Sequence, residues 1–246
     1  MVTAFIDEVF SSVQGEGPRI GERHIFVRFQ GCNIRCSYCD TPAAIQTRSD
    51  ICRAQRSLIS WEQESVPNPL IADRLSALCT RLAVSGQSRP MLSLTGGEPL
   101  LYPDFLSAWL PRMRPAFRIY LETNGIQFEA LRHVVELIDV VSMDIKLPSA
   151  TGLRPFWEEH RKFLAASRGK ECFIKAVVTS DTTRDDIVTA AEIIACFDPT
   201  VSFILQPATG HAAPAPAMLL AFQEIALAIL GDVRVIPQMH KMLQVP

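Results

Sequence analysis

The sequence predicts an α/β fold in which a parallel sheet curves into a partial barrel. Strand-like and helix-like segments alternate from Met91 onward, and this alternation is typical of a parallel sheet with right-handed crossovers. The polar and glycine-rich groups follow the strands, where α/β proteins collect their chemistry. About six main parallel strands are visible, fewer than the eight of a closed barrel. We therefore expect a partial barrel in one domain over residues 1–246.

The composition excludes several classes of protein. The chain is 48% hydrophobic and 20% charged, enough for a large core. Its net charge of −2 gives no basic footprint for nucleic acid, and no segment reaches the roughly 18 apolar residues of a membrane span. The stretch Met1–Glu8 lacks the features of a signal peptide. With an odd number of cysteines, seven, we expect reduced thiols in a cytoplasmic enzyme.

The first predicted strand, Phe5–Phe10, runs into a turn rich in glycine and proline, Ser11–Pro18. In this turn Gln14 and Glu16 could hydrogen-bond a small ligand, or the turn is an ordinary surface connection.

The second predicted strand, His24–Gln30, carries a charge inside an apolar run. Arg28 must lie at the open end of the strand or be paired, because an unpaired buried charge is costly. A guanidinium group also fits a carboxylate, which favours an anionic substrate group.

The cysteine loop Gly31–Thr41 follows this strand. Cys32, Cys36 and Cys39 are separated by three and then two residues, a spacing that suits a loop around a metal centre. Iron–sulfur clusters usually take four thiolates, so three would leave one iron open. A structural zinc site would need a fourth ligand, and the nearest cysteine is Cys52.

The rest of the chain alternates between the two kinds of element. Pro42–Asn68 is polar and irregular, and we expect a loop or a short helical excursion there. The expected helices are Leu70–Ala83, Asp104–Met113, Phe128–Leu137, Pro155–Ala166, Asp185–Cys196 and Ala217–Leu230. The expected strands are Met91–Leu94, Phe117–Leu121, Val140–Met143, Cys172–Thr179, Val201–Leu205 and Val233–Ile236.

Five polar segments follow these strands and should converge on one rim of the sheet. They are Cys32–Thr41, Thr95–Glu98, Glu122–Asn124, Asp144–Lys146 and Gln206.

Among these segments, Thr95–Pro99 contains two glycines that let the backbone approach a ligand. Glu98 could accept a hydrogen bond from that ligand, or it could serve a tight turn at a helix start.

Two motifs together carry a family resemblance. Cys32-x-x-x-Cys36-x-x-Cys39 with Tyr38, followed by Gly96-Gly97-Glu98-Pro99, resembles the radical S-adenosylmethionine (radical SAM) superfamily over almost the whole chain. The resemblance implies a partial (β/α)6 barrel of the radical SAM type and a [4Fe-4S] cluster on the three cysteines. In that superfamily the open iron binds S-adenosylmethionine, which an electron cleaves to a 5′-deoxyadenosyl radical.

Further motifs resemble the 7-carboxy-7-deazaguanine synthase family, a group of radical SAM lyases. They are Phe10-Ser-Ser-Val-Gln-Gly-Glu-Gly17, Gly31-Cys-Asn33, Cys39-Asp-Thr41, Glu122-Thr-Asn-Gly125, Asp144-Ile-Lys146 and Gln238-Met-His-Lys241. The family contracts 6-carboxy-5,6,7,8-tetrahydropterin to 7-carboxy-7-deazaguanine with release of ammonia, in the biosynthesis of queuosine and other 7-deazapurines.

The resemblance also implies roles for single residues. The cluster ligands are Cys32, Cys36 and Cys39, and the contacts to S-adenosylmethionine are Ser37, Tyr38, Cys39, Gly97, Ser142, Asp144, Lys146 and Gln206. The contacts to the pterin are Val13, Gln14, Gly15, Arg28, Thr95 and the C-terminal carboxylate of Pro246, with Glu122 and His240 as assisting polar groups.

Thr41 matches the family's ligand for Mg²⁺, although it could instead cap a helix start. The tail that ends at Pro246 is expected to close the active site.

The resemblance implies a flavodoxin- or ferredoxin-like electron donor and a homodimer. Two other functions share parts of the pattern. A glycyl-radical activating enzyme has the same cysteine spacing but acts on a protein substrate. A non-catalytic zinc-binding module would use the cysteine loop structurally.

Overall fold

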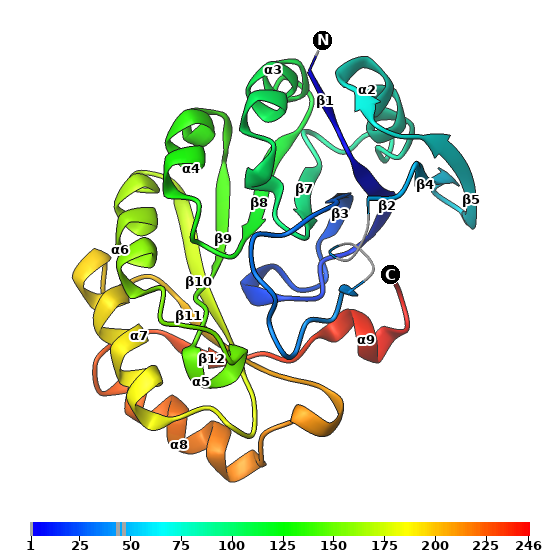
Figure 1. The fold of residues 1–246 in the computed structure, drawn as a ribbon. Coiled ribbons are helices and arrows are strands. Elements are labelled where there is room, and N and C mark those ends of the chain that lie inside the picture. Colours follow the sequence, from blue (N-terminus) through cyan, green and yellow to red (C-terminus); the bar gives the residue numbers. More distant parts are fainter. Residues whose placement is uncertain (1, 43–44, 46–47) are drawn as a thin grey trace.

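The computed structural model describes residues 2–246 except 43, 44, 46 and 47. In this part of the chain ten strands form one sheet in the order β12-β11-β10-β9-β8-β7-β3-β2-β4-β5. Neighbours from β3 to β12 are parallel. The sheet curves but stays open between β12 and β5 (Figure 1). The predicted α/β partial barrel with six main parallel strands is confirmed, and β12 is the expected short last strand.

The strands are β1 (Thr3–Ala4), β2 (Ile6–Val13), β3 (Arg23–Phe29), β4 (Ile51–Ser57), β5 (Ser60–Pro67), β6 (Leu70–Ile71), β7 (Met91–Gly96), β8 (Arg118–Thr123), β9 (Val140–Asp144), β10 (Glu171–Val178), β11 (Phe203–Pro207) and β12 (Val233–Val235). The α-helices of the described residues are α2 (Ala72–Arg81), α3 (Pro103–Met113), α4 (Phe128–Val134), α5 (Pro148–Thr151), α6 (Trp157–Ala166), α7 (Arg184–Phe197), α8 (Pro216–Leu227) and α9 (Met239–Leu243).

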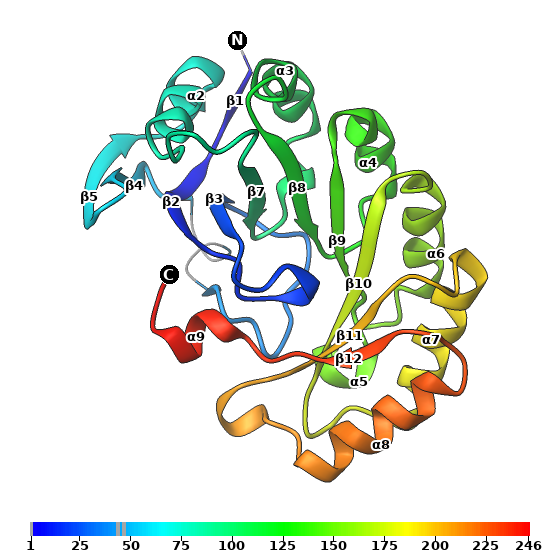
Figure 2. The same ribbon diagram turned by 180° about the vertical axis from the view of Figure 1, so that it is seen from behind.

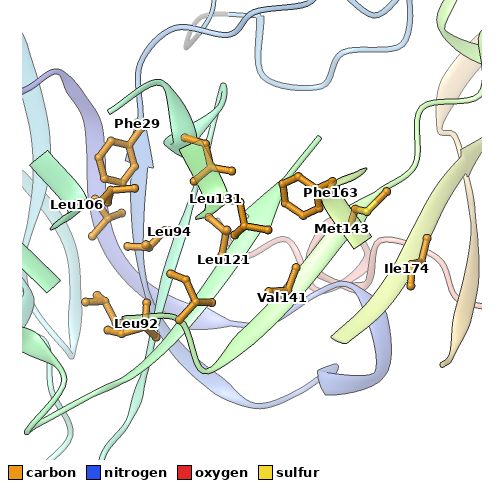
Figure 3. Close-up of a cluster of buried hydrophobic side chains, with 14 of the residues drawn as sticks. Phe29, Leu92, Leu94, Leu106, Leu121, Leu131, Val141, Met143, Phe163 and Ile174 are labelled. Carbon is orange, nitrogen blue, oxygen red and sulfur yellow. The ribbon is translucent and has the colours of Figure 1, made fainter. Parts of the chain in front are cut away.

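Helices cover the convex face of the sheet, and the concave face holds the turn after β2 together with α9 (Figures 1 and 2). Between sheet and helices lies a continuous apolar core, because strands buried on both faces are apolar along their length. Figure 3 shows part of it: Leu92, Leu94, Leu121 and Val141 from the sheet with Leu106, Leu131 and Phe163 from α3, α4 and α6. This core fixes the strands whose ends carry the polar groups.

The expected loop over Pro42–Asn68 is wrong for most of that segment. β4 and β5 form an antiparallel hairpin that extends the sheet beyond β2. At the start of β4 the burial alternates: Ile51 and Arg53 are exposed, whereas Cys52 and Ala54 are buried. An edge hairpin needs only this one apolar face. Its sequence is therefore mostly polar and lacks the apolar run by which a strand buried on both faces is recognised. Residues 43, 44, 46 and 47 of the expected loop, and Met1, lie outside the described residues.

Smaller differences concern the two ends of the chain. β2 extends through Val13, so the glycine-rich turn begins later than expected. The short helix α9 near the C-terminus was not expected. No helix among the described residues has both the length and the apolar character that crossing a membrane requires.

Candidate active site

A cavity of about 750 Å³ opens at the carboxyl ends of the parallel strands, a size within the range of small-molecule sites. Glu16 lines it and Glu98 does not, and every residue to which the family resemblance gave a role lines it. These residues are Val13, Gln14, Gly15, Arg28, Cys32, Cys36, Ser37, Tyr38, Cys39, Thr41, Thr95, Gly97, Glu122, Ser142, Asp144, Lys146, Gln206, His240 and Pro246.

The cysteine loop is joined to the glycine-rich segment after β7 through backbone contacts. Gly97 N donates to Phe29 O at 3.0 Å, and Glu98 N donates to Gly31 O at 2.8 Å. A Cβ atom on Gly97 would lie 1.9 Å from Gly31 O. The glycine is therefore required because two loops of this chain meet there.

Glu98 serves the turn, not the ligand. Its side chain is completely buried and accepts hydrogen bonds from Leu100 N, Thr123 Oγ1 and Asn124 N at 2.8–3.1 Å. Burial raises the pKa of Glu98 to about 7. Of the two alternatives for this residue, the structure supports the tight turn.

The three thiols of the loop are free and half-buried at the cavity wall. Arg35 Nη1 donates to Cys32 O at 2.8 Å, and Asn124 Nδ2 lies 3.8 Å from Cys32 Sγ. Burial raises the pKa of Cys36 to about 11, so this thiol stays protonated at neutral pH until a metal ion displaces its proton.

The donor set fits an iron–sulfur cluster with an open iron. Cys52 cannot be a fourth ligand, because it is completely buried in β4. Within residues 2–42, 45 and 48–246, no three His, Cys, Asp or Glu side chains already converge in a metal-binding arrangement. This includes the three thiols, which share one loop at the cavity wall and would have to turn toward one another around a cluster.

On the far side of the cysteine loop, charged and polar groups follow β9 and β11. Lys146 Nζ donates to Asp144 Oδ2 at 2.9 Å and lies 5.4 Å from the centre of the Tyr38 ring. Asp144 Oδ1 and Gln206 Oε1 are buried and have no hydrogen-bond partner in the described part of the chain. Unpaired buried acceptors are costly, and N–H or O–H donors of a bound ligand would satisfy them.

A buried histidine holds this side in place. Lys146 N donates to His160 Nε2 at 3.1 Å, and His160 Nδ1 lies 3.0 Å from Gly125 O. One ring nitrogen must therefore accept while the other donates, which requires the neutral imidazole. Burial lowers the pKa of His160 to about 4, consistent with that state.

The opposite side of the cavity joins three of the predicted pterin contacts. Glu122 accepts hydrogen bonds from Gln14 Nε2 at 2.9 Å and from Thr95 Oγ1 at 2.6 Å. Arg28 is paired, with its Nε 2.6 Å from Glu8 Oε1 of β2. Both alternatives for Arg28 therefore hold, since it is paired and also lines the cavity.

Aromatic side chains add an apolar surface to this side. The rings of Phe10 and Phe26 stack with their centres 5.0 Å apart, and the Arg28 guanidinium lies 5.7 Å from the centre of the Phe10 ring. A flat heterocycle can stack on such a surface while its polar edge meets Glu122.

The C-terminal segment lies against the turn after β2. Met239 N donates to Gly15 O at 2.8 Å, and Lys241 Nζ donates to Thr209 Oγ1 at 3.2 Å. His240 and Pro246 reach the cavity wall, and burial lowers the pKa of His240. Of Thr41, the structure shows its hydroxyl 4.0 Å from Cys39 Sγ; the helix start it could cap includes residues outside the described part.

The cavity residues without a role from the sequence include Asp40, Lys175 and Gln238. Lys175 lies inside the apolar strand β10, and a charge in such a strand is a signal that could have revealed it. Gln238 lies directly before α9 and donates to Asp40 Oδ2 at 2.7 Å.

Known proteins similar to this chain agree with these features. The family model of the radical SAM superfamily matches residues 26–192. A 7-carboxy-7-deazaguanine synthase of Geobacter sulfurreducens is 42% identical over 249 residues, covering 98% of this chain and 97% of the relative. A synthase of the same name from Methanopyrus kandleri is 36% identical, with coverage of 96% and 92%. The crystal structure of QueE from Escherichia coli shares the fold, with a TM-score of 0.60 at 20% identity and coverage of 97% and 95%.

Proposed function

Because this chain belongs to the radical SAM superfamily and, within it, to the 7-carboxy-7-deazaguanine synthase family, we propose that it contracts 6-carboxy-5,6,7,8-tetrahydropterin to 7-carboxy-7-deazaguanine. Ammonia is released, and the product enters 7-deazapurine and queuosine biosynthesis. The observation that carries this proposal is the single cavity in which the cysteine loop faces the Gln14–Glu122–Thr95 cluster. A glycyl-radical activating enzyme would need an opening for a protein loop, whereas Gln14, Arg28 and Thr41, which also line this cavity, suit a small acid.

Cys32, Cys36 and Cys39 are the residues that hold the four-iron cluster in this proposal. The cluster and S-adenosylmethionine, when bound, supply a carbon-centred radical that abstracts a hydrogen atom from the substrate. Asp144 Oδ1 and Gln206 Oε1 accept hydrogen bonds from the cofactor, because both atoms are otherwise unpaired. Ser37, Tyr38, Gly97, Ser142 and Lys146 complete this side of the cavity.

The protein's task on the substrate side is orientation and exclusion of water. Glu122 presents a carboxylate fixed by two donors, so it can accept from the amino and ring N–H groups of a pterin without moving. Arg28 offers its remaining guanidinium N–H groups to the substrate carboxylate. Val13, Gly15 and Thr95 border the ring, and neutral His240 lies beside the turn.

Two further parts of the proposal concern Mg²⁺ and the tail. The Thr41 hydroxyl is a hard oxygen donor, and Mg²⁺ commonly takes one or two protein ligands and completes its shell with water and substrate. There the ion would act as a Lewis acid and a template. The segment from Gln238 to Pro246 closes the site of this single domain, and the Pro246 carboxylate binds the pterin. Its contact with Gly15 supports this closing role.

A radical SAM enzyme needs a one-electron donor, and we extend the proposal to a flavodoxin- or ferredoxin-like protein. A homodimer is typical of the family, and we include it in the proposal. A cytoplasmic setting is supported by the seven free cysteines, which a reducing compartment maintains.

Anaerobic turnover of the reconstituted enzyme tests this function. The pterin, S-adenosylmethionine and a chemical reductant are supplied with and without Mg²⁺. We expect a 7-deazapurine and ammonia, with higher rates when Mg²⁺ is present. Cleavage of S-adenosylmethionine without a 7-deazapurine would favour an activating enzyme. A colourless protein that contains zinc and lacks the brown cluster absorption would favour the zinc-binding module.

A further inference from the structure

Glu16 joins three distant segments of the chain at the concave side of the sheet. Lys175 Nζ of β10 donates to its Oε2. Gln206 Nε2 of β11 and Gln238 Nε2 donate to its Oε1 at 3.2 Å and 2.7 Å. These three partners are 159, 190 and 222 residues away in the sequence. One carboxylate therefore holds two strands and the start of the C-terminal segment.

The segments that meet at Glu16 serve different sides of the cavity. Gln206 belongs to the cofactor side, and Lys175 Nζ lies 3.9 Å from Asp144 Oδ2 of the same side. Gly15, the chain neighbour of Glu16, belongs to the substrate side and accepts the N–H of Met239 at the start of α9. A shift of Glu16 would consequently displace groups on both sides of the cavity.

The pair formed by Glu16 and Lys175 is largely buried, with side chains 16% and 10% exposed. Burial works against both charges, but their mutual attraction outweighs it. The pKa of Glu16 is lowered to about 2, and Glu16, Asp144 and Glu122 raise the pKa of Lys175. Removing one partner leaves an uncompensated buried charge, so the pair fixes the relative position of the turn and β10.

We propose that Glu16 is a positioning residue that couples the cofactor side of the active site to the substrate side and to the C-terminal segment. Through Lys175 and Gln206 it holds β10 and β11, and through Gln238 and the turn it holds the groups that contact the pterin. The names of the two sides rest on the proposed function. The consequence is that hydrogen abstraction stays coupled to product formation only while this carboxylate is charged.

Glu16→Gln tests the coupling, because a glutamine amide still accepts from Gln238 but cannot neutralise Lys175. We expect the ratio of 5′-deoxyadenosine to 7-deazapurine and the KM for the pterin to rise by about tenfold, since small misplacements cost this much or more. Cleavage of S-adenosylmethionine itself is retained. Amide hydrogen exchange of residues 239–243 becomes faster in the reconstituted enzyme without substrate.

Arg19→Gln is the matched control. Arg19 lies on the same connection between β2 and β3 as Glu16, and it pairs with Glu171 on the same strand as Lys175, but neither residue lines the cavity. Loss of the pair between Arg19 and Glu171 should leave two quantities at their wild-type values: the ratio of 5′-deoxyadenosine to 7-deazapurine and the rate of amide hydrogen exchange in residues 239–243. The same uncoupling in both variants would reduce Glu16 to an ordinary structural contact and overturn the proposal.

A double variant keeps the test valid if the single one folds poorly. Glu16→Gln with Lys175→Met removes both charges and leaves no buried charge unpaired. We expect it to fold and to remain uncoupled, whereas restored coupling would contradict the proposal. If the wild-type enzyme forms no 7-deazapurine, the proposed function fails. The exchange of residues 239–243 in Glu16→Gln against Arg19→Gln still tests the coupling in that case.

Discussion

Two loops meet at the cavity, and they are held there in different ways. The cysteine loop Gly31–Thr41 is held largely through backbone carbonyl groups: Glu98 N donates to Gly31 O, Ser37 donates to the carbonyl groups of Ala150 and Thr151, and Arg35 donates to carbonyl groups of the loop itself. The turn Val13–Gly17 is held by side chains more than a hundred residues away, through Gln14 to Glu122 and Glu16 to Lys175. The first loop carries its chemistry in local spacing, whereas the second acquires its role only through distant partners. Cofactor binding and substrate geometry should therefore respond to different substitutions.

Cys36→Ala has the largest expected effect because it removes a thiolate from the cluster. Two protein ligands would remain of the three, so cleavage of S-adenosylmethionine should fall below detection. Iron content and the brown absorption band should fall with it, while the fold stays intact by circular dichroism. A Cys36→Ala protein that still forms 5′-deoxyadenosine would show that the cysteine loop is not the radical source.

Gly97→Ala tests whether the contact between the two strand-end loops holds the cysteine loop in place. The added Cβ would lie 1.9 Å from Gly31 O, and we expect the backbone to shift at a cost of about 1–3 kcal/mol. Activity should decrease about 10- to 100-fold, because the cluster moves relative to the substrate.

Gly231→Ala is the control for this substitution. There the nearest heavy atom to a new Cβ is Pro199 O at 3.8 Å, an ordinary contact. Thermal unfolding and cluster content measured on both variants should separate them. Equal losses would contradict a specific role for Gly97.

A tag placed after Pro246 should affect the substrate side alone. The C-terminal segment contacts the turn at Gly15, so a longer chain would displace the Pro246 carboxylate from the cavity wall. We expect the KM for the pterin to rise about tenfold, with the cluster spectrum unchanged. The same tag at the N-terminus is the control. An equal KM for the pterin in both tagged proteins would contradict the proposed role of Pro246.

Thr41→Ala should have a smaller effect and should divide the cysteine loop into two functional parts. The cluster ligands precede Thr41, so iron content and basal cleavage of S-adenosylmethionine are expected to stay near wild type. The Mg²⁺ concentration for half-maximal product formation should rise several-fold, on the order of 1 kcal/mol of lost binding. Loss of the cluster in Thr41→Ala would contradict this division.

The same contrast explains which features could be predicted from the sequence. The strands β7 to β11 are apolar runs followed by polar groups, so both their order and the rim they build were predictable. Cys32, Cys36 and Cys39 could be proposed as cluster ligands from the sequence because that proposal depends only on spacing within one loop. The β4–β5 hairpin was missed because its one buried face leaves a polar sequence.

Side-chain partners remote in sequence were not predictable in the same way. Nothing near Glu16 in the sequence indicates Lys175, and the strand that carries Lys175 reads as ordinary core apart from its charge. Glu98 shows the reverse situation. Its motif suggested a ligand contact, but hydrogen bonds from Leu100, Thr123 and Asn124 occupy its carboxylate. Long-range packing decides both cases.

His160→Gln tests how far the cofactor side depends on one buried imidazole. The pKa of His160 is lowered to about 4 in the folded protein, against about 6.5 in an unfolded chain. As pH falls through this window the unfolded state takes up the proton first, so the folded state loses stability. Between pH 7 and pH 5 this one residue should account for about 2 kcal/mol of the decrease in the free energy of unfolding.

Glutamine cannot titrate, so the variant should be less stable at pH 7 but should lose less stability on acidification. Its amide oxygen can still accept from Lys146 N, and activity at neutral pH should change little. His24 and Glu98 also have shifted pKa values, but both proteins contain them, and the difference between the two urea unfolding series isolates His160. Parallel pH dependences would mean that the charge state of His160 does not stabilise the fold. A smaller slope in the variant would show that the cofactor side depends on a neutral histidine, whereas the turn Val13–Gly17 depends on an ion pair that stays charged over the same pH range.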